Sequence, residues 1–155
     1  MTTQETLNSR SELESIAQQV LDYARDEGAT SAEADIGIGE GLSVTVRMGE
    51  LEAIEHQRDK GLGITVYVDQ RKGSASTTDF SAQAIKDSVL AACTIARNAS
   101  SDKYAGLIAA EYLATEIPDL DLYHPWKITP DQATELAIEC ETAARQIDSR
   151  ITNAD

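Results

Sequence analysis

The amino-acid sequence predicts an α+β domain in which an antiparallel sheet of four to five strands is covered by two to three helices. Apolar residues recur at helical spacing near both ends of the chain. Between residues 32 and 78 they alternate with period two, which is typical of strands with one buried face. The connections between these strands are too short for parallel pairing, so neighbouring strands should be antiparallel. A sheet with helices on its apolar face satisfies this order, and we expect residues 1–155 to form a single domain.

The first predicted element is a helix from about Ser11 to Glu27. Ser11 and Glu14 have the spacing of a capping box, in which each side chain binds the backbone N–H of the other residue. Gly28 is expected to end the helix. One face of this helix is apolar and consists of Leu13, Ile16, Ala17, Val20, Leu21 and Ala24.

The next segment predicts the sheet. Glycine-containing or charged stretches divide the alternating pattern, and each of them is interpreted as a turn or a connection. The last strand is short and rich in small residues, as expected at a sheet edge. The expected strands are residues 32–38, 42–48, 51–57, 62–68 and 73–78, separated by 39–41, 49–50, 58–61 and 70–72.

Two more helices are predicted after the sheet. One extends from about Ser81 to Asn98, with Ser81 as its N-cap. The other begins with Thr129 as cap, Pro130 at the first helical position and Gln132 closing a capping box. Their apolar faces are Ile85, Val89, Ala92, Cys93 and Ala96 in one helix, and Ala133, Leu136, Ala137, Cys140, Ala144 and Ile147 in the other.

Two segments lie outside these elements. The connection 99–128 is longer than an ordinary loop, so we expect it to run over the surface. Residues 150–155 have the pattern of a strand that is cut short, which indicates a fragment of a longer protein.

Charge and composition exclude several classes of function. The net charge of −14 comes from 27 acidic and 13 basic side chains, so phosphate backbones and anionic lipid surfaces should be repelled. No apolar run approaches the ~20 residues of a membrane span. Two cysteines without an apolar leader fit a reducing compartment. We therefore expect a cytoplasmic protein with no direct nucleic-acid partner and no membrane contact.

The best metal-site candidate is the group formed by Asp119, Asp121 and His124. Carboxylate and imidazole groups are common metal ligands, but a fourth ligand is not visible in the sequence. Pro118 and Pro125 flank these residues. A solvated acidic loop fixed by two prolines is therefore the favoured interpretation.

A second candidate lies on the weak strand 51–57 and the turn before it. Strand alternation places Glu50, Glu52 and His56 on one face and Glu55 on the other. This arrangement is more typical of the exposed face of a half-buried strand. Trp126 could form a binding spot, but a lone aromatic residue before a helix usually packs as a staple or lid.

The remaining motifs predict no chemistry. Cys93 and Cys140 lie on apolar helix faces and are expected to pack in the core. Residues 61–63, Gly-Leu-Gly, precede a strand, whereas a dinucleotide-binding loop follows one. Residues 73–76 do not match a nucleophile elbow. The residues alone therefore predict no catalytic, cofactor-binding or metal site.

Three central segments carry a family resemblance. Residues 47–55 (RMGELEAIE), 61–67 (GLGITVY) and 71–79 (RKGSASTTD) resemble the N-terminal domain of the PmbA/TldD family, also called modulators of DNA gyrase. The similarity continues through residues 119–125 (DLDLYHP) and ends at 150–153 (RITN). The segment RKGSAS resembles the PmbA, or TldE, branch more than the TldD branch.

The resemblance implies a non-catalytic domain of a longer protein. The family is associated with cytoplasmic metalloproteolysis of small or unfolded peptides. A TldD-type subunit carries a His-Glu-x-x-x-His zinc motif in its C-terminal portion, whereas a PmbA-type subunit acts as its partner. No residue of this chain matches that motif, so no catalytic, cofactor-binding or metal residue is assigned. The resemblance implies a role in assembly, as a dimer with a TldD-type subunit or with itself, and in enclosing unfolded peptides, with zinc in the TldD-type partner.

Two alternatives from other classes stay open. The chain could be a stand-alone module that binds extended peptides along an exposed strand edge. It could also be an enzyme that uses Asp119, Asp121 and His124. Peptide binding by the isolated chain would favour the first, and bound metal would favour the second.

Overall fold

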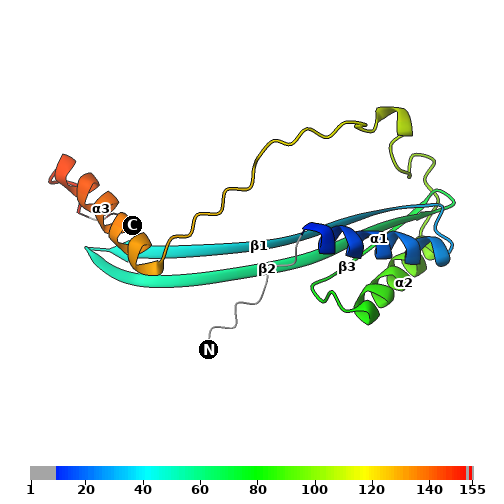
Figure 1. Ribbon diagram of the computed structural model, residues 1–155, viewed down its shortest axis with the longest axis horizontal. Coiled ribbons are helices and arrows are strands. Elements are labelled where there is room, and N and C mark those ends of the chain that lie inside the picture. The colour runs from blue at the N-terminus through cyan, green and yellow to red at the C-terminus, as the bar shows by residue number, and fades with distance from the viewer. Residues whose placement is uncertain (1–9, 153, 155) are drawn as a thin grey trace. The chain divides into compact units, whose positions relative to one another are not determined.

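The computed structural model describes residues 10–152 and 154. Contacts divide the chain into two compact units, a first unit of residues 1–38 and 59–115 and a second unit of residues 39–58 and 116–155. The elements in chain order are α1 (Arg10–Asp26), β1 (Ser31–Arg47), β2 (Glu50–Val68), β3 (Arg71–Thr77), α2 (Ala82–Asn98), the 3-10 turn η1 (Ala110–Tyr112) and α3 (Pro130–Ile147) (Figure 1).

The sheet confirms the α+β class but has fewer strands than predicted. Its three strands lie in the order β1-β2-β3. β2 and β3 pair antiparallel, with Leu62 opposite Thr77 and Val68 opposite Arg71. The prediction of four to five strands is not confirmed, because two predicted pairs of strands are each one continuous strand.

The predicted breaks at residues 39–41 and 58–61 are wrong. β1 passes through Gly39 and Gly41 without the left-handed backbone that Gly28 and Gly49 adopt. The apolar residues before and after residues 39–41 all have even numbers, so the period-two pattern is never interrupted. In β2 the polar stretch stays in the strand, and Arg58 Nε lies 3.4 Å from an oxygen of Glu40. These glycines and charged residues therefore belong to extended strands.

Both hairpins close through two-residue turns. Met48 and Gly49 have φ angles of 56° and 79°, and Asp69 and Gln70 have φ angles of 47° and 63°. Positive φ at both central residues is the signature of a type I′ turn, whose twist matches that of the flanking strands. The turns lie one residue before the predicted positions. Gly28, with a φ of 82°, follows the end of α1 as predicted.

The caps of α2 and α3 form as the sequence predicts, whereas the predicted capping box of Ser11 and Glu14 is wrong. α1 already includes Arg10, so Ser11 lies inside the helix, and Glu14 Oε1 accepts a 2.8 Å hydrogen bond from Arg10 Nε. The Ser81 hydroxyl accepts a 3.4 Å hydrogen bond from Ala84 N at the start of α2. At α3, Gln132 N donates to Thr129 Oγ1 over 3.3 Å and Thr129 N donates to Gln132 Oε1 over 3.0 Å. Pro130 takes the first helical position. Each cap satisfies backbone N–H groups that a helix leaves unpaired.

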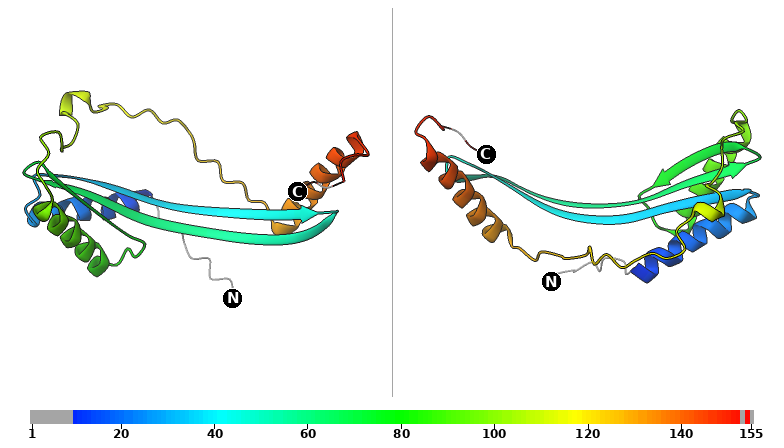
Figure 2. Two further views of the ribbon diagram at one scale, coloured as in Figure 1. Left: turned by 180° about the vertical axis from the view of Figure 1, so that it is seen from behind. Right: turned by 90° about the horizontal axis from the view of Figure 1, so that it is seen from above.

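The core of the first unit lies between the sheet and two helices. α1 and α2 both cover the same face of the sheet (Figure 2). The predicted apolar face of α2 is completely buried there. The core residues are Val20, Ala24, Leu62, Ile64, Val66, Ile85, Val89, Ala92, Cys93 and Ala96. The opposite face of the sheet in this unit, here called the open face, carries the polar and glycine positions of the alternating pattern.

At Gly73, β3 lies so close to α2 that there is no room for a side chain. A Cβ atom at Gly73 would lie 2.1 Å from the carbonyl oxygen of Ala92 and 2.5 Å from the backbone nitrogen of Ala96. Both of these are backbone atoms, so a rotamer change could not relieve the collision. The strand and helix therefore pack through small residues, and the position requires glycine.

In the second unit, α3 contacts the β1–β2 turn through a buried carboxylate. The Glu141 side chain accepts hydrogen bonds from Met48 N over 2.8 Å and from Gly49 N over 2.7 Å. Arg145 Nη1 lies 3.5 Å from a Glu141 oxygen. Glu141 is only 5% exposed although it is charged. Its bonds to the turn explain why it occupies the centre of the packed face of α3.

The predicted apolar face of α3 is therefore partly wrong. Leu136, Cys140 and Ile147 are exposed. The helix is turned so that Glu141 contacts the hairpin, and this rotation moves those three residues off the packed face. The expectation that Cys140 packs in the core is not met, whereas Cys93 is fully buried.

We expect the two cysteines to react at very different rates. Cys140 should be labelled rapidly by a thiol reagent in the native protein, while Cys93 should react only after unfolding. Burial also raises the pKa of the Cys93 thiol, which lowers its reactive thiolate fraction. Thiol titration with and without denaturant measures this. Cys140→Ser should abolish native labelling, and labelling of both thiols in the folded chain would contradict the structure.

The helices in the described part of the chain are too short or too polar to cross a bilayer.

Candidate functional site

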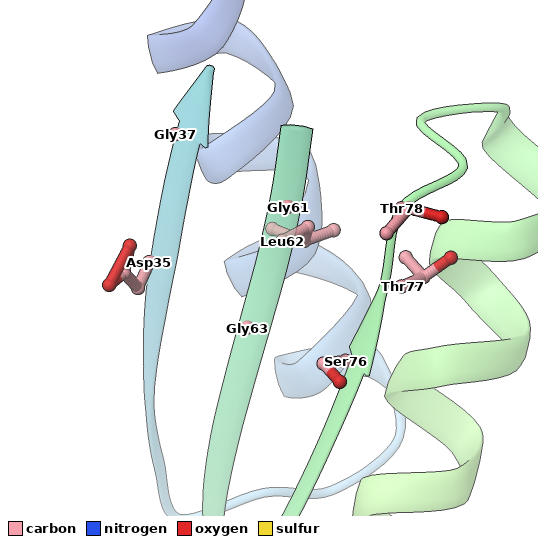
Figure 3. Close-up of a pocket in the computed structure, with 8 residues that line it drawn as sticks. All are labelled: Asp35, Gly37, Gly61, Leu62, Gly63, Ser76, Thr77 and Thr78. Atoms are coloured by element: carbon pink, nitrogen blue, oxygen red, sulfur yellow. The ribbon is translucent and has the colours of Figure 1, made fainter. Parts of the chain in front are cut away.

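The open face of the first unit contains a hollow of about 750 Å³. Its lining comes from all three strands and the residue after β3 (Figure 3). Three glycines form part of the floor, so the layer of side chains that normally covers a sheet is missing there and backbone is exposed. The lining residues are Asp35, Gly37, Gly61, Leu62, Gly63, Ser76, Thr77 and Thr78.

The polar groups that line the hollow are suited to binding the polar or cationic groups of a ligand. Asp35 on β1 and Ser76 on β3 lie at opposite sides of the glycine floor (Figure 3). Thr77 Oγ1 accepts a 3.0 Å hydrogen bond from Asp79 N, which occupies that hydroxyl. No histidine or cysteine lines the hollow to activate a hydroxyl as a nucleophile. Its carboxylate and hydroxyls can instead hold polar or cationic groups.

Neighbouring polar side chains on the open face bind one another. The Tyr67 hydroxyl donates to Glu33 Oε1 over 3.3 Å, and the hydroxyls of Thr65 and Ser74 lie 3.0 Å apart. Burial raises the pKa of Tyr67, and the adjacent Glu33 carboxylate raises it further. Asp35 has no ion-pair partner among the residues that the structure describes. It is therefore available to an external cation.

The first metal-site candidate, formed by Asp119, Asp121 and His124, lies in a loop. Asp121 N donates to Asp119 Oδ1 over 2.9 Å, which forms a local turn. His124 Nε2 lies 3.6 Å from Asp121 Oδ2, and both side chains are largely exposed. Within residues 10–152 and 154, no group of three His, Cys, Asp or Glu side chains is arranged to hold a metal ion. These three side chains therefore lie in an exposed acidic loop.

The second candidate lies on an exposed part of β2. Glu50, Glu52, Glu55 and His56 are all exposed. Glu52 lies 3.9 Å from Arg47 Nη1 in a surface ion pair. Glu55 is exposed like the other three although strand alternation places it on the opposite face, so this part of β2 is not half-buried as expected.

Sequence reasoning missed an exposed apolar series in the connection before α3. Trp126 is 73% exposed, so it does not pack as the expected staple or lid. The sequence did contain a signal for this series, because the connection has many large apolar residues that follow neither helical nor strand periodicity. Residues 104–113 of the series belong to the first unit, and residues 117–126 belong to the second unit. The exposed series is Tyr104, Leu107, Ile108, Tyr112, Leu113, Ile117, Leu120, Leu122, Tyr123 and Trp126.

Comparison with known sequences places the hollow within a recognised domain. The family described as PmbA/TldA metallopeptidase domain 1 matches residues 32–96, which include every residue that lines the hollow. Metalloprotease PmbA from Escherichia coli O157:H7 is 48% identical over 143 residues, covering 92% of this chain and 32% of that protein. A Metalloprotease PmbA homolog from Haemophilus influenzae is 44% identical, covering 93% of this chain and 32% of that protein.

Solved structures show the same fold. A candidate modulator of DNA gyrase from Bacteroides thetaiotaomicron superposes with a TM-score of 0.81 at 24% identity, over 95% of this chain and 34% of that chain. TldE from Thermococcus kodakarensis superposes with a TM-score of 0.66 at 17% identity, over 86% of this chain and 30% of that chain. The chain thus spans about a third of the length of the relatives it matches.

Proposed function

This chain belongs to the PmbA/TldD metallopeptidase family, whose first domain it contains, and from that premise we propose that it is the non-catalytic N-terminal domain of a PmbA-type, or TldE-type, subunit. One observation carries the proposal. The similarity to Metalloprotease PmbA extends over 92% of this chain but only 32% of that protein. About two thirds of the length of that relative therefore lies outside the matched region, where the residues that carry out the chemistry can be located.

We assign this domain a role in assembly with a TldD-type or second PmbA-type subunit and in enclosing small unfolded peptides. The exposed apolar residues at 104–113 of the first unit, and separately those at 117–126 of the second unit, support the assembly role, because burying exposed apolar side chains against a partner is favourable. The hollow on the open face supports contact with polar groups of a peptide.

Zinc is assigned to the TldD-type partner, where it would supply an activated water for peptide hydrolysis. The acidic loop of this chain does not fit a catalytic zinc site. One Asp119 oxygen already accepts a backbone N–H, and the described residues offer no third ligand beside Asp121 and His124.

Two linked experiments test the proposal. The chain alone, purified without chelators, should not hydrolyse an unfolded peptide when zinc is added. A chimera in which this chain replaces the aligned 143 residues of the Escherichia coli protein should still co-purify with its TldD-type partner and support hydrolysis. Stoichiometric zinc and turnover by the chain alone, abolished by His124→Ala but not by the control His56→Ala, would overturn the proposal.

A second candidate function is peptide binding by the isolated chain. The observation that favours it is the position of β1 at the side of the sheet, with one of its two edges free of a strand neighbour among the described residues. Such an edge can accept an extended peptide through backbone hydrogen bonds.

A further inference from the structure

We propose that residues 32–38 of β1, here called the β1 edge, bind an extended peptide of alternating apolar and basic residues as an added strand. The inference rests on the peptide-binding role proposed above and specifies its location and the class of peptide. Three observations support the inference. β1 lacks the features that usually prevent an edge strand from pairing, the core beside β1 is incomplete, and the open face beside β1 is acidic.

The two edge strands of the sheet differ in the features that prevent pairing with another strand. Edge strands usually avoid unwanted pairing by being short or by carrying lysine, proline or a bulge. β3 is a strand of 7 residues that begins with Arg71 and Lys72. β1 is a strand of 17 residues with no lysine or proline, and its first basic residue is Arg47 at the far end. The β1 edge is therefore the one open to strand addition.

The core of the first unit is incomplete beside the β1 edge. Ala34 and Ile36 pack against the core but stay partly exposed. The equivalent inward residues of the central strand, Leu62 and Ile64, are each only 2% exposed. A strand added to β1 would cover the remaining apolar surface if its inward-pointing residues were apolar.

A cavity of about 220 Å³ lies at the start of β1. It is formed between α1 and the first residues of the strand, and it can receive one inward side chain of an added strand. Its lining residues are Leu21, Arg25, Ala29, Thr30, Ser31 and Ala32.

The open face determines the charge of the peptide. Glu33 and Asp35 alternate with the inward residues of the β1 edge and are exposed. Side chains of an added strand that point to the open face would lie beside these carboxylates, where lysine or arginine is favourable. The net charge of −14 would also attract a cationic peptide over a longer range.

The same charges disfavour a second copy of the chain at this edge. Antiparallel pairing of two β1 edges would place Glu33 and Asp35 of one copy near the same residues of the other. Like charges in cross-strand positions destabilise a sheet. A basic peptide therefore fits the β1 edge better than self-association.

The test uses short fluorescent peptides and the full 155-residue chain. The probe alternates valine and lysine. One control peptide has the same composition with all valines before all lysines, and another replaces lysine by glutamate. Fluorescence anisotropy should show about tenfold tighter binding of the alternating basic probe than of either control. Hydrogen exchange should slow at residues 32–38 when the probe binds, but not at β3.

Matched charge reversals separate a local contact from net charge. Asp35→Lys should weaken probe binding about tenfold, because a favourable cross-strand pair becomes a repulsive one. Glu139→Lys makes the same change of charge at an exposed position of α3, and it should change affinity by less than about twofold.

Three results would overturn the inference. These are equal affinity for the block peptide, protection of β3 instead of the β1 edge, or concentration-dependent self-association that protects residues 32–38 without peptide. The chimera tests the subunit role independently. A functional chimera with no probe binding would remove only the strand-addition proposal, and probe binding with a chimera that does not assemble would remove only the subunit role.

Discussion

Gly73→Ala is expected to destabilise the first unit by about 3 kcal/mol or more, the upper part of the range for overpacking in a closely packed interior. The added methyl group would lie 2.1 Å from Ala92 O and 2.5 Å from Ala96 N. Since both are backbone atoms of α2, either β3 or the helix must move. Moving the helix would separate Val89 and Cys93 from the buried core. Urea unfolding followed by circular dichroism measures the loss.

Gly61→Ala is the matched control. Gly61 is also a strand glycine, but a Cβ at this position would meet no heavy atom within 4 Å. Its substitution should change the free energy of unfolding by less than about 1 kcal/mol. Equal stability of the two variants would show that β3 and α2 do not pack as closely at Gly73 as described.

Local signals predicted the caps of α2 and α3 well. The capping box of Thr129 and Gln132 and the Ser81 cap depend on residues only three positions apart. The apolar face of α2 was also predicted completely, because every residue of its regular helical pattern lies in the buried core of the first unit. In these segments, local sequence and tertiary packing favour the same arrangement.

The strand boundaries were predicted less well because glycine has two roles. Gly39 and Gly41 were interpreted as a turn, yet both lie within the extended strand β1. The uninterrupted even-numbered alternation favoured a continuous strand, whereas the positive φ of Gly49 marks the real turn. Composition alone does not distinguish these roles.

The hollow could not be predicted because its lining depends on how three strands align. Asp35, Gly63 and Ser76 are far apart in sequence, and the pairing of β2 with β3 places Gly63 opposite Ser76. The burial of Glu141 could not be predicted either, because a charged residue on a helix is normally expected to be exposed to solvent. Its partners are backbone N–H groups of Met48 and Gly49, which carry no side-chain signal.

Glu141→Ala is expected to destabilise the second unit by about 2–4 kcal/mol, because it removes the acceptor of two charge-assisted hydrogen bonds. The N–H groups of Met48 and Gly49 would lose their partner, and Arg145 would lose its nearby carboxylate. Glu141→Gln keeps one acceptor oxygen and nearly the same shape, so its effect should be intermediate. The order of stability should be wild type, Gln, then Ala.

Hydrogen exchange at the turn measures this effect locally, which is necessary because two compact units need not unfold together. The amides of Met48 and Gly49 should exchange fastest in Glu141→Ala and at an intermediate rate in Glu141→Gln. Glu139→Ala removes an exposed carboxylate from the same helix and should leave both amides protected as in the wild type. If all three variants exchange alike, the buried carboxylate does not hold the turn. If only Glu141→Ala differs, one acceptor oxygen is sufficient for protection.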